Sequence, residues 1–246
     1  MAEEVELKLI VGDLAAFDRL RVQLERQAGP PTLREQTNFY LDTADRGLRR
    51  RRAMARLRTA GSDGGGARLA WWTCKAEPVL RDGVMRVEER ERRLDGPAQA
   101  RLLADGAPRG DLTVGDVDPD GWLQRPRAEG GMLVDPLQAT ARLHVLGALA
   151  TTRRIYRVPW PIARNPADPA PAPTDLALEL DHARYSQGAE RFELEVETPA
   201  VERVRPFIEE LLAAADVDAA PAQQSKYAQF LQLADQAVGW REGPVA

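Results

Sequence analysis

Two segments of this chain combine carboxylates with apolar residues in strict alternation. Residues 4–8 read Glu-Val-Glu-Leu-Lys, and residues 193–197 read Glu-Leu-Glu-Val-Glu. A period of two is typical of a β-strand with one polar and one apolar face, so each segment places its glutamates on one face. Grouped carboxylates are the oxygen ligands that Mg²⁺ and Mn²⁺ prefer, and such ions commonly bridge to phosphates. The two segments therefore indicate a divalent-metal site, provided that the strands come together.

Basic residues alternate with apolar ones in several other segments. Taken singly, each such strand is typical of a half-buried sheet whose charges face water. That interpretation is weakened because three glutamates on one strand face repel one another unless cations lie opposite. The pattern alone therefore favours a metal-dependent phosphate site inside a barrel whose polar faces point inward. The cations would come from Arg56, Arg58, Lys75, Arg86 and Arg154.

The acidic and basic strand faces meet around one space only if the sheet closes on itself. We therefore predict an α+β fold built on a closed antiparallel eight-stranded β-barrel. Its lumen is polar and charged, and its apolar faces pack outward against amphipathic helices. A barrel of about eight strands has room for side chains and one small ligand. Apolar residues at helical spacing predict helices over 13–29, 203–215 and 225–238, with a shorter one over 138–149.

The composition excludes several classes of protein. The 246 residues carry a formal net charge of −4 and one cysteine, Cys74, so no disulfide can form within the chain. No run approaches the roughly 20 apolar residues of a membrane span. Residues 1–8 lack the basic and then apolar pattern of a signal peptide. Because the mild acidity also argues against a nucleic-acid binder, we expect a cytoplasmic protein that binds neither nucleic acid nor membranes.

A series of motifs runs through nearly the whole chain. The first, Glu-x-Glu-x-Lys, is common by itself in charged strands and helices, but the complete series is specific. Its members lie at residues 4–8, 40–43 (Tyr-Leu-Asp-Thr), 56–58 (Arg-Leu-Arg), 73–75 (Thr-Cys-Lys), 86–88 (Arg-Val-Glu), 154 (Arg), 181 (Asp), 193–197 and 225–227 (Ser-Lys-Tyr). In these motifs and their order, the chain resembles the CYTH superfamily, also called the triphosphate tunnel metalloenzymes.

The resemblance implies a single tunnel domain over residues 1–238 and a C-terminal tail over 239–246. Residues 97–141 match no family motif, and we predict a variable helical or loop insertion that covers one face of the tunnel. The four arginines at 49–52 also depart from the family, which often has a glycine turn and a leucine there. The start of the following strand therefore stays open.

The resemblance further implies hydrolysis of a triphosphate held lengthwise in the tunnel, with Mg²⁺ or Mn²⁺ as cofactor. Glu193 and Glu195, together with Asp181, would hold one ion. Glu4 and Glu6 would hold a second ion or orient the attacking water.

Phosphate binding is implied for the basic residues of the motifs. Lys8 would also act in catalysis beside the glutamates of its strand, and Glu88 would support nearby arginines through ion pairs. The candidate phosphate-binding residues are Lys8, Arg56, Arg58, Lys75, Arg86, Arg154 and Lys226.

Three positions have a second interpretation. Arg154 and Arg157 lie three residues apart and cannot share a strand face, and we favour Arg154 as the inward residue. Asp181 could instead be a turn residue whose side chain bonds to the backbone. Lys226 could be a solvated residue at the start of a helix.

The function also has alternatives. Inorganic triphosphate is the favoured substrate, and thiamine triphosphate or a nucleotide would share its triphosphate group. The CYTH superfamily includes class IV adenylate cyclases, but the His-Phe pair that often precedes their first motif does not precede Glu4. A non-catalytic module that binds polyphosphate or nucleotide is the other alternative, although a polyanion receptor has no use for so many carboxylates beside its ligand.

Overall fold

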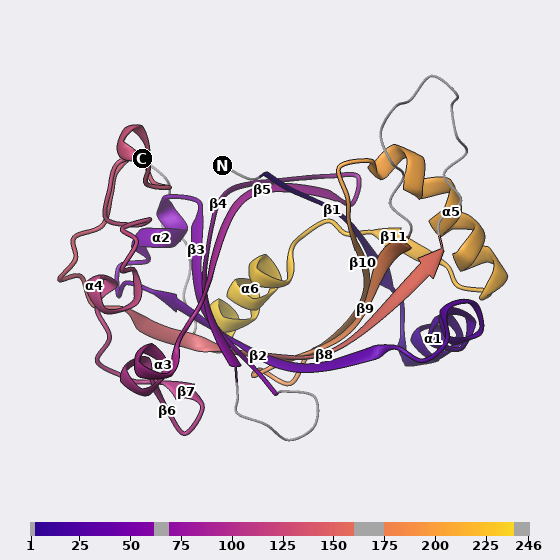
Figure 1. The fold of residues 1–246 in the computed structure, drawn as a ribbon, viewed down its shortest axis with the longest axis horizontal. Helices are drawn as coiled ribbons and strands as arrows, with labels where there is room; N and C mark the ends of the chain where they lie inside the picture. The colour runs from indigo at the N-terminus through magenta and orange to yellow at the C-terminus, as the bar shows by residue number, and fades with distance from the viewer. Residues whose placement is uncertain (1–2, 62–68, 160–174, 239–246) are drawn as a thin grey trace.

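Eight long antiparallel strands form a closed barrel in the computed structural model of the protein, which describes residues 3–61, 69–159 and 175–238 (Figure 1). Neighbouring strands follow the order β1-β5-β4-β3-β2-β8-β9-β10, and β10 pairs with β1 to close the barrel. The predicted fold class, a closed eight-stranded antiparallel barrel with helices outside, is confirmed. The strands are β1 (Glu3–Val11), β2 (Thr32–Asp42), β3 (Ala53–Ala60), β4 (Leu69–Arg81), β5 (Val84–Arg93), β8 (His144–Pro159), β9 (Asp175–Tyr185) and β10 (Glu190–Glu197), and the short β11 (Ala219–Pro221) pairs with β1.

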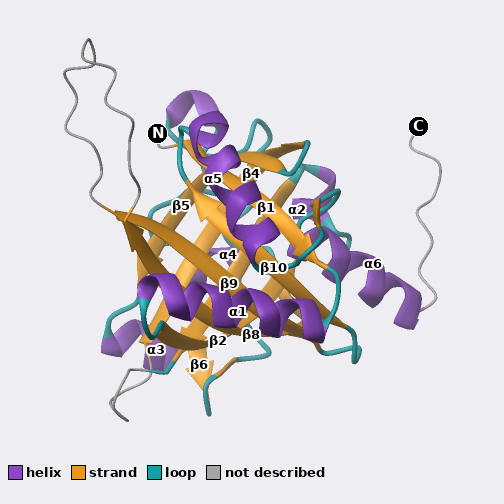
Figure 2. Ribbon diagram, turned by 90° about the vertical axis from the view of Figure 1, so that its right-hand side faces the viewer, coloured by secondary structure: helices purple, strands orange, loops and turns teal. Residues whose placement is uncertain are grey.

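Two helices cover the outer wall formed by β1, β8, β9 and β10. Helix α1 (Leu14–Ala28) starts at Asp13, whose side chain accepts a hydrogen bond from the Ala16 backbone N–H, and ends at Gly29 with φ 76°. Such an aspartate cap and a glycine with positive φ are standard helix ends. Helix α1 and helix α5 (Val201–Ala214) lie across the outside of the barrel in Figure 2. Their apolar faces share one core with Leu7, Leu180 and Leu194 of the strands, so the apolar face of each strand points outward.

Helix α6 (Lys226–Val238) lies within the outline of the barrel in Figure 1 and packs against one end of its interior. Phe230 and Leu231 of α6 share a core with Tyr40, Leu149 and Tyr185 of the barrel strands. Asp235 near the other end of α6 forms ion pairs with Arg49, at 2.6 Å, and with Arg46, at 3.7 Å. These contacts connect α6 to the short helix α2 (Gly47–Arg50). Among the described residues, none of the helices is long and apolar enough to cross a membrane.

The prediction of a helix over 138–149 is wrong, because β8 already begins at His144. This strand pairs with β2 along one edge and with β9 along the other. A short apolar run does not by itself distinguish a helix from a buried strand. Hydrogen bonding on both edges decides the structure here.

The segment between β5 and β8 forms a small layer on the outer face of β3 and β4. Its core residues Leu112, Leu123 and Met132 pack with Leu57 and Trp72 of the barrel. The buried thiol of Cys74 lies in the same core, and burial raises its pKa, as expected for an unreactive cysteine. The elements of this layer are α3 (Gly96–Leu102), β6 (Leu103–Ala104), β7 (Ala107–Pro108), α4 (Val114–Val117) and the 3₁₀ helix Arg127–Glu129.

A buried carboxylate holds this layer together, and its removal is a test of the packing. Asp118 is fully buried and accepts hydrogen bonds from the backbone N–H groups of Trp122, at 2.9 Å, and Leu123, at 2.7 Å. We expect Asp118→Ala to lower the free energy of unfolding by about 2 kcal/mol, because both buried donors lose their partner. Denaturant unfolding measures the loss, and limited proteolysis locates it in residues 94–143.

Asp120→Ala is the matched control for this substitution. The Asp120 side chain is 36% exposed and pairs with Arg92 at the surface, so its loss costs less than about 1 kcal/mol. Equal destabilisation by the two substitutions would contradict the role given to Asp118.

Candidate active site in the barrel tunnel

A cavity of about 680 Å³ occupies the interior of the barrel. We call this cavity the tunnel. Among the described residues its lining contains nine basic and eight acidic side chains, so their formal charges nearly cancel. The basic residues are Lys8, Arg34, Arg49, Arg52, Arg56, Arg58, Lys75, Arg153 and Lys226, and the acidic residues are Glu4, Glu6, Glu89, Glu91, Glu179, Asp181, Glu195 and Glu197.

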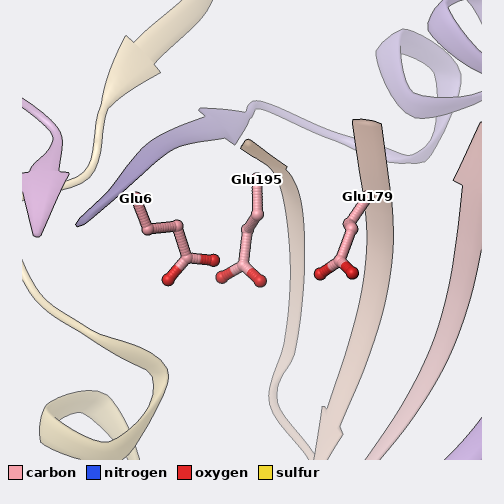
Figure 3. Close-up of side chains that lie close together, drawn as sticks. All are labelled: Glu6, Glu179 and Glu195. Carbon is pink, nitrogen blue, oxygen red and sulfur yellow. The ribbon is translucent and has the colours of Figure 1, made fainter. Parts of the chain in front are cut away.

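Three carboxylates from three strands converge in this tunnel. Glu6 of β1, Glu179 of β9 and Glu195 of β10 each offer an oxygen atom, and these atoms lie within 4.8 Å of one another (Figure 3). Glu179 and Glu195 are directly opposite in the β9–β10 register, and β10 in turn pairs with β1. We call these residues the acidic triad. Its donor set consists of carboxylate oxygens alone, which suits a hard divalent cation such as Mg²⁺ or Mn²⁺.

Basic side chains of the chain itself hold the acidic triad together. Lys8 Nζ lies 2.6 Å from Glu6 and 2.5 Å from Glu195. Lys226 Nζ lies 2.6 Å from Glu195, and Arg153 lies 2.6 Å from the other oxygen of Glu195 and also contacts Glu179. Glu195 is therefore shared by three cations.

Burial and neighbouring charge shift the acid–base properties of this group. Burial and then the charge of Glu195 raise the pKa of Glu6 to about 7. Burial also opposes ionisation of Glu195, but Lys226, Lys8 and Arg153 outweigh it and hold its pKa well below the ordinary value. Burial alone would lower the pKa of Lys8, yet Glu195 and Glu6 keep it above its ordinary value. The cluster therefore contains ionised glutamate and lysine at neutral pH.

A second charged group, from β1, β4 and β5, lies beside the triad. Lys75 Nζ lies 2.6 Å from both Glu4 and Glu89. Burial and a hydrogen bond to Glu89 raise the pKa of Glu4 to about 8. The hydrogen bond from Glu4 and the charge of Lys75 overcome the burial of Glu89 and lower its pKa to about 2. Of the two carboxyls, Glu4 therefore favours the neutral form and Glu89 the ionised form. Arg56 lies 3.5 Å from Glu89 on the same wall.

Comparison with known proteins identifies this architecture. A family model described as the CYTH domain matches residues 2–220. The chain belongs to the CYTH family. The resemblance noted from the sequence is therefore confirmed. No curated protein sequence matches the chain.

Solved structures of other proteins share the CYTH fold. A putative adenylyl cyclase from Hippeastrum, described as having a dominant triphosphatase activity, is 24% identical, with a TM-score of 0.71 over 93% of this chain and 95% of its own. A putative adenylate cyclase from Bacillus halodurans is 21% identical, with a TM-score of 0.55 over 94% and 99% of the two chains. A Pyrococcus horikoshii protein is 15% identical, with a TM-score of 0.54 over 93% and 98%. At these identities the likeness shows the fold alone.

Most of the site residues expected from the sequence lie in the tunnel of this CYTH domain. Glu193 is the exception among the expected metal ligands, since it lies on the same strand face as Glu195 but is fully buried by Lys226 and Arg191 and does not reach the tunnel lining. Asp181 pairs with Arg153 and Lys226, so it is not a simple turn residue. Lys226 is half-buried among carboxylates and is not a solvated helix start. The expected residues that line the tunnel are Glu4, Glu6, Lys8, Arg56, Arg58, Lys75, Asp181, Glu195 and Lys226.

The inward placement of Arg86 is wrong. In the β1–β5 register Glu4 lies opposite Val87 and Glu6 opposite Met85, and directly opposite residues share a face. Arg86 and Glu88 therefore lie on the outer face, where Glu88 pairs with Arg90 and Arg127. A displacement of one residue along a strand moves every side chain to the other face.

The choice between Arg154 and Arg157 is also wrong, because Arg153 is the arginine of β8 that lines the tunnel. The guanidinium of Arg154 lies 5.4 Å from the ring centroid of Phe17, under α1 on the outside of the barrel. Arg157 is exposed and does not line the tunnel. Two adjacent arginines give no alternation from which the inward face could be read.

Glu179 is a further tunnel residue that the sequence analysis missed. A signal for it was present, because Glu179 and Asp181 alternate with apolar residues in the segment Leu-Glu-Leu-Asp at 178–181. The tunnel residues of β2, which are Arg34, Gln36, Asn38 and Tyr40, were missed as well. They carry no charge pattern that stands out along the chain.

Proposed function

We propose that this CYTH protein hydrolyses a small triphosphate in the tunnel, with inorganic triphosphate as the favoured substrate and Mg²⁺ or Mn²⁺ as cofactor. The observation that carries the proposal is the acidic triad, which lies among basic side chains inside one closed barrel. Carboxylates for a cation and cations for phosphoryl oxygens are the two components that phosphoryl transfer requires.

Residues of the acidic triad would hold the ion. A divalent cation supplies charge neutralisation at the phosphoryl oxygens when bound. Without a bound cation, these carboxylates form ion pairs with basic side chains of the chain itself, namely Lys8, Arg153 and Lys226. Because the tunnel charges nearly cancel, the triphosphate gains little attraction until the carboxylates have another cation. Metal dependence thus follows from the charge balance.

The basic side chains would then bind the phosphate chain. Arg56 and Arg58 lie on one face of β3 and can each donate two parallel hydrogen bonds to phosphoryl oxygens. Lys8, Lys75 and Lys226 act as point charges along the tunnel. Arg153 takes the position that we had expected for Arg154, and Glu4, beside Glu6 on β1, would orient the attacking water.

Phosphate release is the direct test. The protein is incubated with inorganic triphosphate, thiamine triphosphate or ATP, each with Mg²⁺, Mn²⁺ or EDTA. We expect release with either metal, fastest from inorganic triphosphate, and none with EDTA. Cyclic AMP as the product from ATP would instead identify an adenylate cyclase. Tight triphosphate binding with no release from any substrate would identify a non-catalytic binding module.

A further inference from the structure

Arg34 is an exposed residue of the tunnel lining at the end away from α6, which we call the open end. Strand β2 lines the tunnel with Arg34, Gln36, Asn38 and Tyr40. The Tyr40 ring centroid lies 4.9 Å from that of Tyr227 and 4.8 Å from that of Phe230, so Tyr40 marks the end against which α6 packs. Arg34 is six residues away along the strand, which corresponds to about 20 Å at about 3.3 Å per residue.

The register places Arg34 directly opposite Arg153 on β8. Like charges in such a pair destabilise a sheet unless other groups neutralise them. Arg153 is neutralised by Glu179, Asp181 and Glu195. The Arg34 side chain forms no hydrogen bond or ion pair with the residues that the structure describes.

The other basic residues of the described tunnel lining have acceptors within the chain. Lys8, Arg56, Lys75 and Lys226 contact carboxylates. Arg58 donates to Asn38, at 3.2 Å. Arg49 pairs with Asp235, and Arg52 donates to the Pro78 carbonyl. Arg34 is thus the tunnel cation whose acceptor is not supplied by the described part of the protein.

We propose that Arg34 binds the phosphoryl group nearest the open end and selects linear inorganic phosphate chains over triphosphate esters. The proposal rests on the proposed function. An ester must leave its organic group at the open end, because the other end is packed by α6. A terminal phosphoryl group there offers the guanidinium one more unesterified oxygen and a higher negative charge than the esterified phosphoryl group of ATP does, and the cationic ring of thiamine is repelled.

Steady-state kinetics on two substrates tests this selectivity. Arg34→Gln should lower kcat/KM for inorganic triphosphate about tenfold, the effect of losing a charge-assisted hydrogen bond, and lower that for ATP by a clearly smaller factor. Arg34→Lys keeps the charge but not the paired hydrogen bonds, so its loss on inorganic triphosphate should be smaller than that of Arg34→Gln. Arg157→Gln removes an equal charge from β8 outside the tunnel lining, and it should leave the substrate ratio unchanged.

Three results would overturn the proposal: an equal loss on both substrates, no loss on either, or the same loss in Arg157→Gln. Binding of diimidotriphosphate, whose bridging nitrogens resist hydrolysis, separates this proposal from the proposed function. If the wild-type protein hydrolyses neither substrate, the proposed function fails. A dissociation constant raised about tenfold by Arg34→Gln would then still support the role of Arg34, and an unchanged constant would refute it.

Discussion

We expect Glu195→Gln to slow metal-dependent phosphate release by at least about a thousandfold, or about 4 kcal/mol in activation free energy. The substitution removes the central charge of the acidic triad. The barrel should remain folded, because each cation that loses Glu195 keeps another carboxylate. Lys8 keeps Glu6, Lys226 keeps Asp181, and Arg153 keeps both Glu179 and Asp181. We also expect weaker Mn²⁺ binding, so phosphate release, thermal unfolding and Mn²⁺ calorimetry measure the three expectations.

Glu197→Gln is the matched control, because it makes the same chemical change two residues further along β10. Glu197 lines the tunnel but is exposed and lies outside the acidic triad. We expect it to reduce the rate less than about tenfold. If Glu195→Gln retained wild-type turnover and Mn²⁺ affinity, the triad would not be the metal site.

Replacement of Lys8 by methionine should destabilise the metal-free protein by about 3 kcal/mol. Lys8 is 5% exposed and lies between Glu6 and Glu195, so its loss leaves two buried carboxylates with less compensation. A divalent cation in the triad would restore that compensation. We therefore expect Mn²⁺ to stabilise Lys8→Met by at least about 1 kcal/mol more than it stabilises the wild type. Denaturant unfolding with Mn²⁺ and with EDTA measures both effects.

Lys75→Met provides the comparison for this rescue. Lys75 is a half-buried tunnel lysine, but its partners are Glu4 and Glu89 rather than two members of the triad. We expect Lys75→Met to lower the free energy of unfolding as well, but Mn²⁺ should restore much less of that loss than it does in Lys8→Met. Equal rescue of both variants would show that the ion acts through the general charge of the tunnel. No rescue of Lys8→Met would count against metal binding by Glu6 and Glu195.

Several tunnel faces can be read from the sequence because one face of the strand is apolar. In β3, Leu57 lies between Arg56 and Arg58, and its side chain is buried in the outer core. In β10, Leu194 likewise separates Glu193 from Glu195. Alternation therefore assigns the inward residues of these strands from the local sequence.

The same reasoning fails where both faces of a strand carry charge. Residues 88–93 of β5 are all charged, so alternation does not distinguish the two faces of this strand. The residues on the outer face also have polar partners. There Arg90 donates to the Gly130 carbonyl, and Glu88 pairs with Arg127. Only the pairing with β1, which sets Val87 opposite Glu4, shows that Glu89 faces the tunnel.

The sequence by itself determined the alternating strands, the three long helices and the CYTH motifs, since these follow from local periodicity and the order of short segments. The tertiary structure alone decided which carboxylates meet. Glu6 is far in sequence from Glu179 and Glu195, and the pairing of β10 with β1 brings it to them. The barrel closes only if the registers of all eight strand pairs fit together. No single segment of the sequence carries that information.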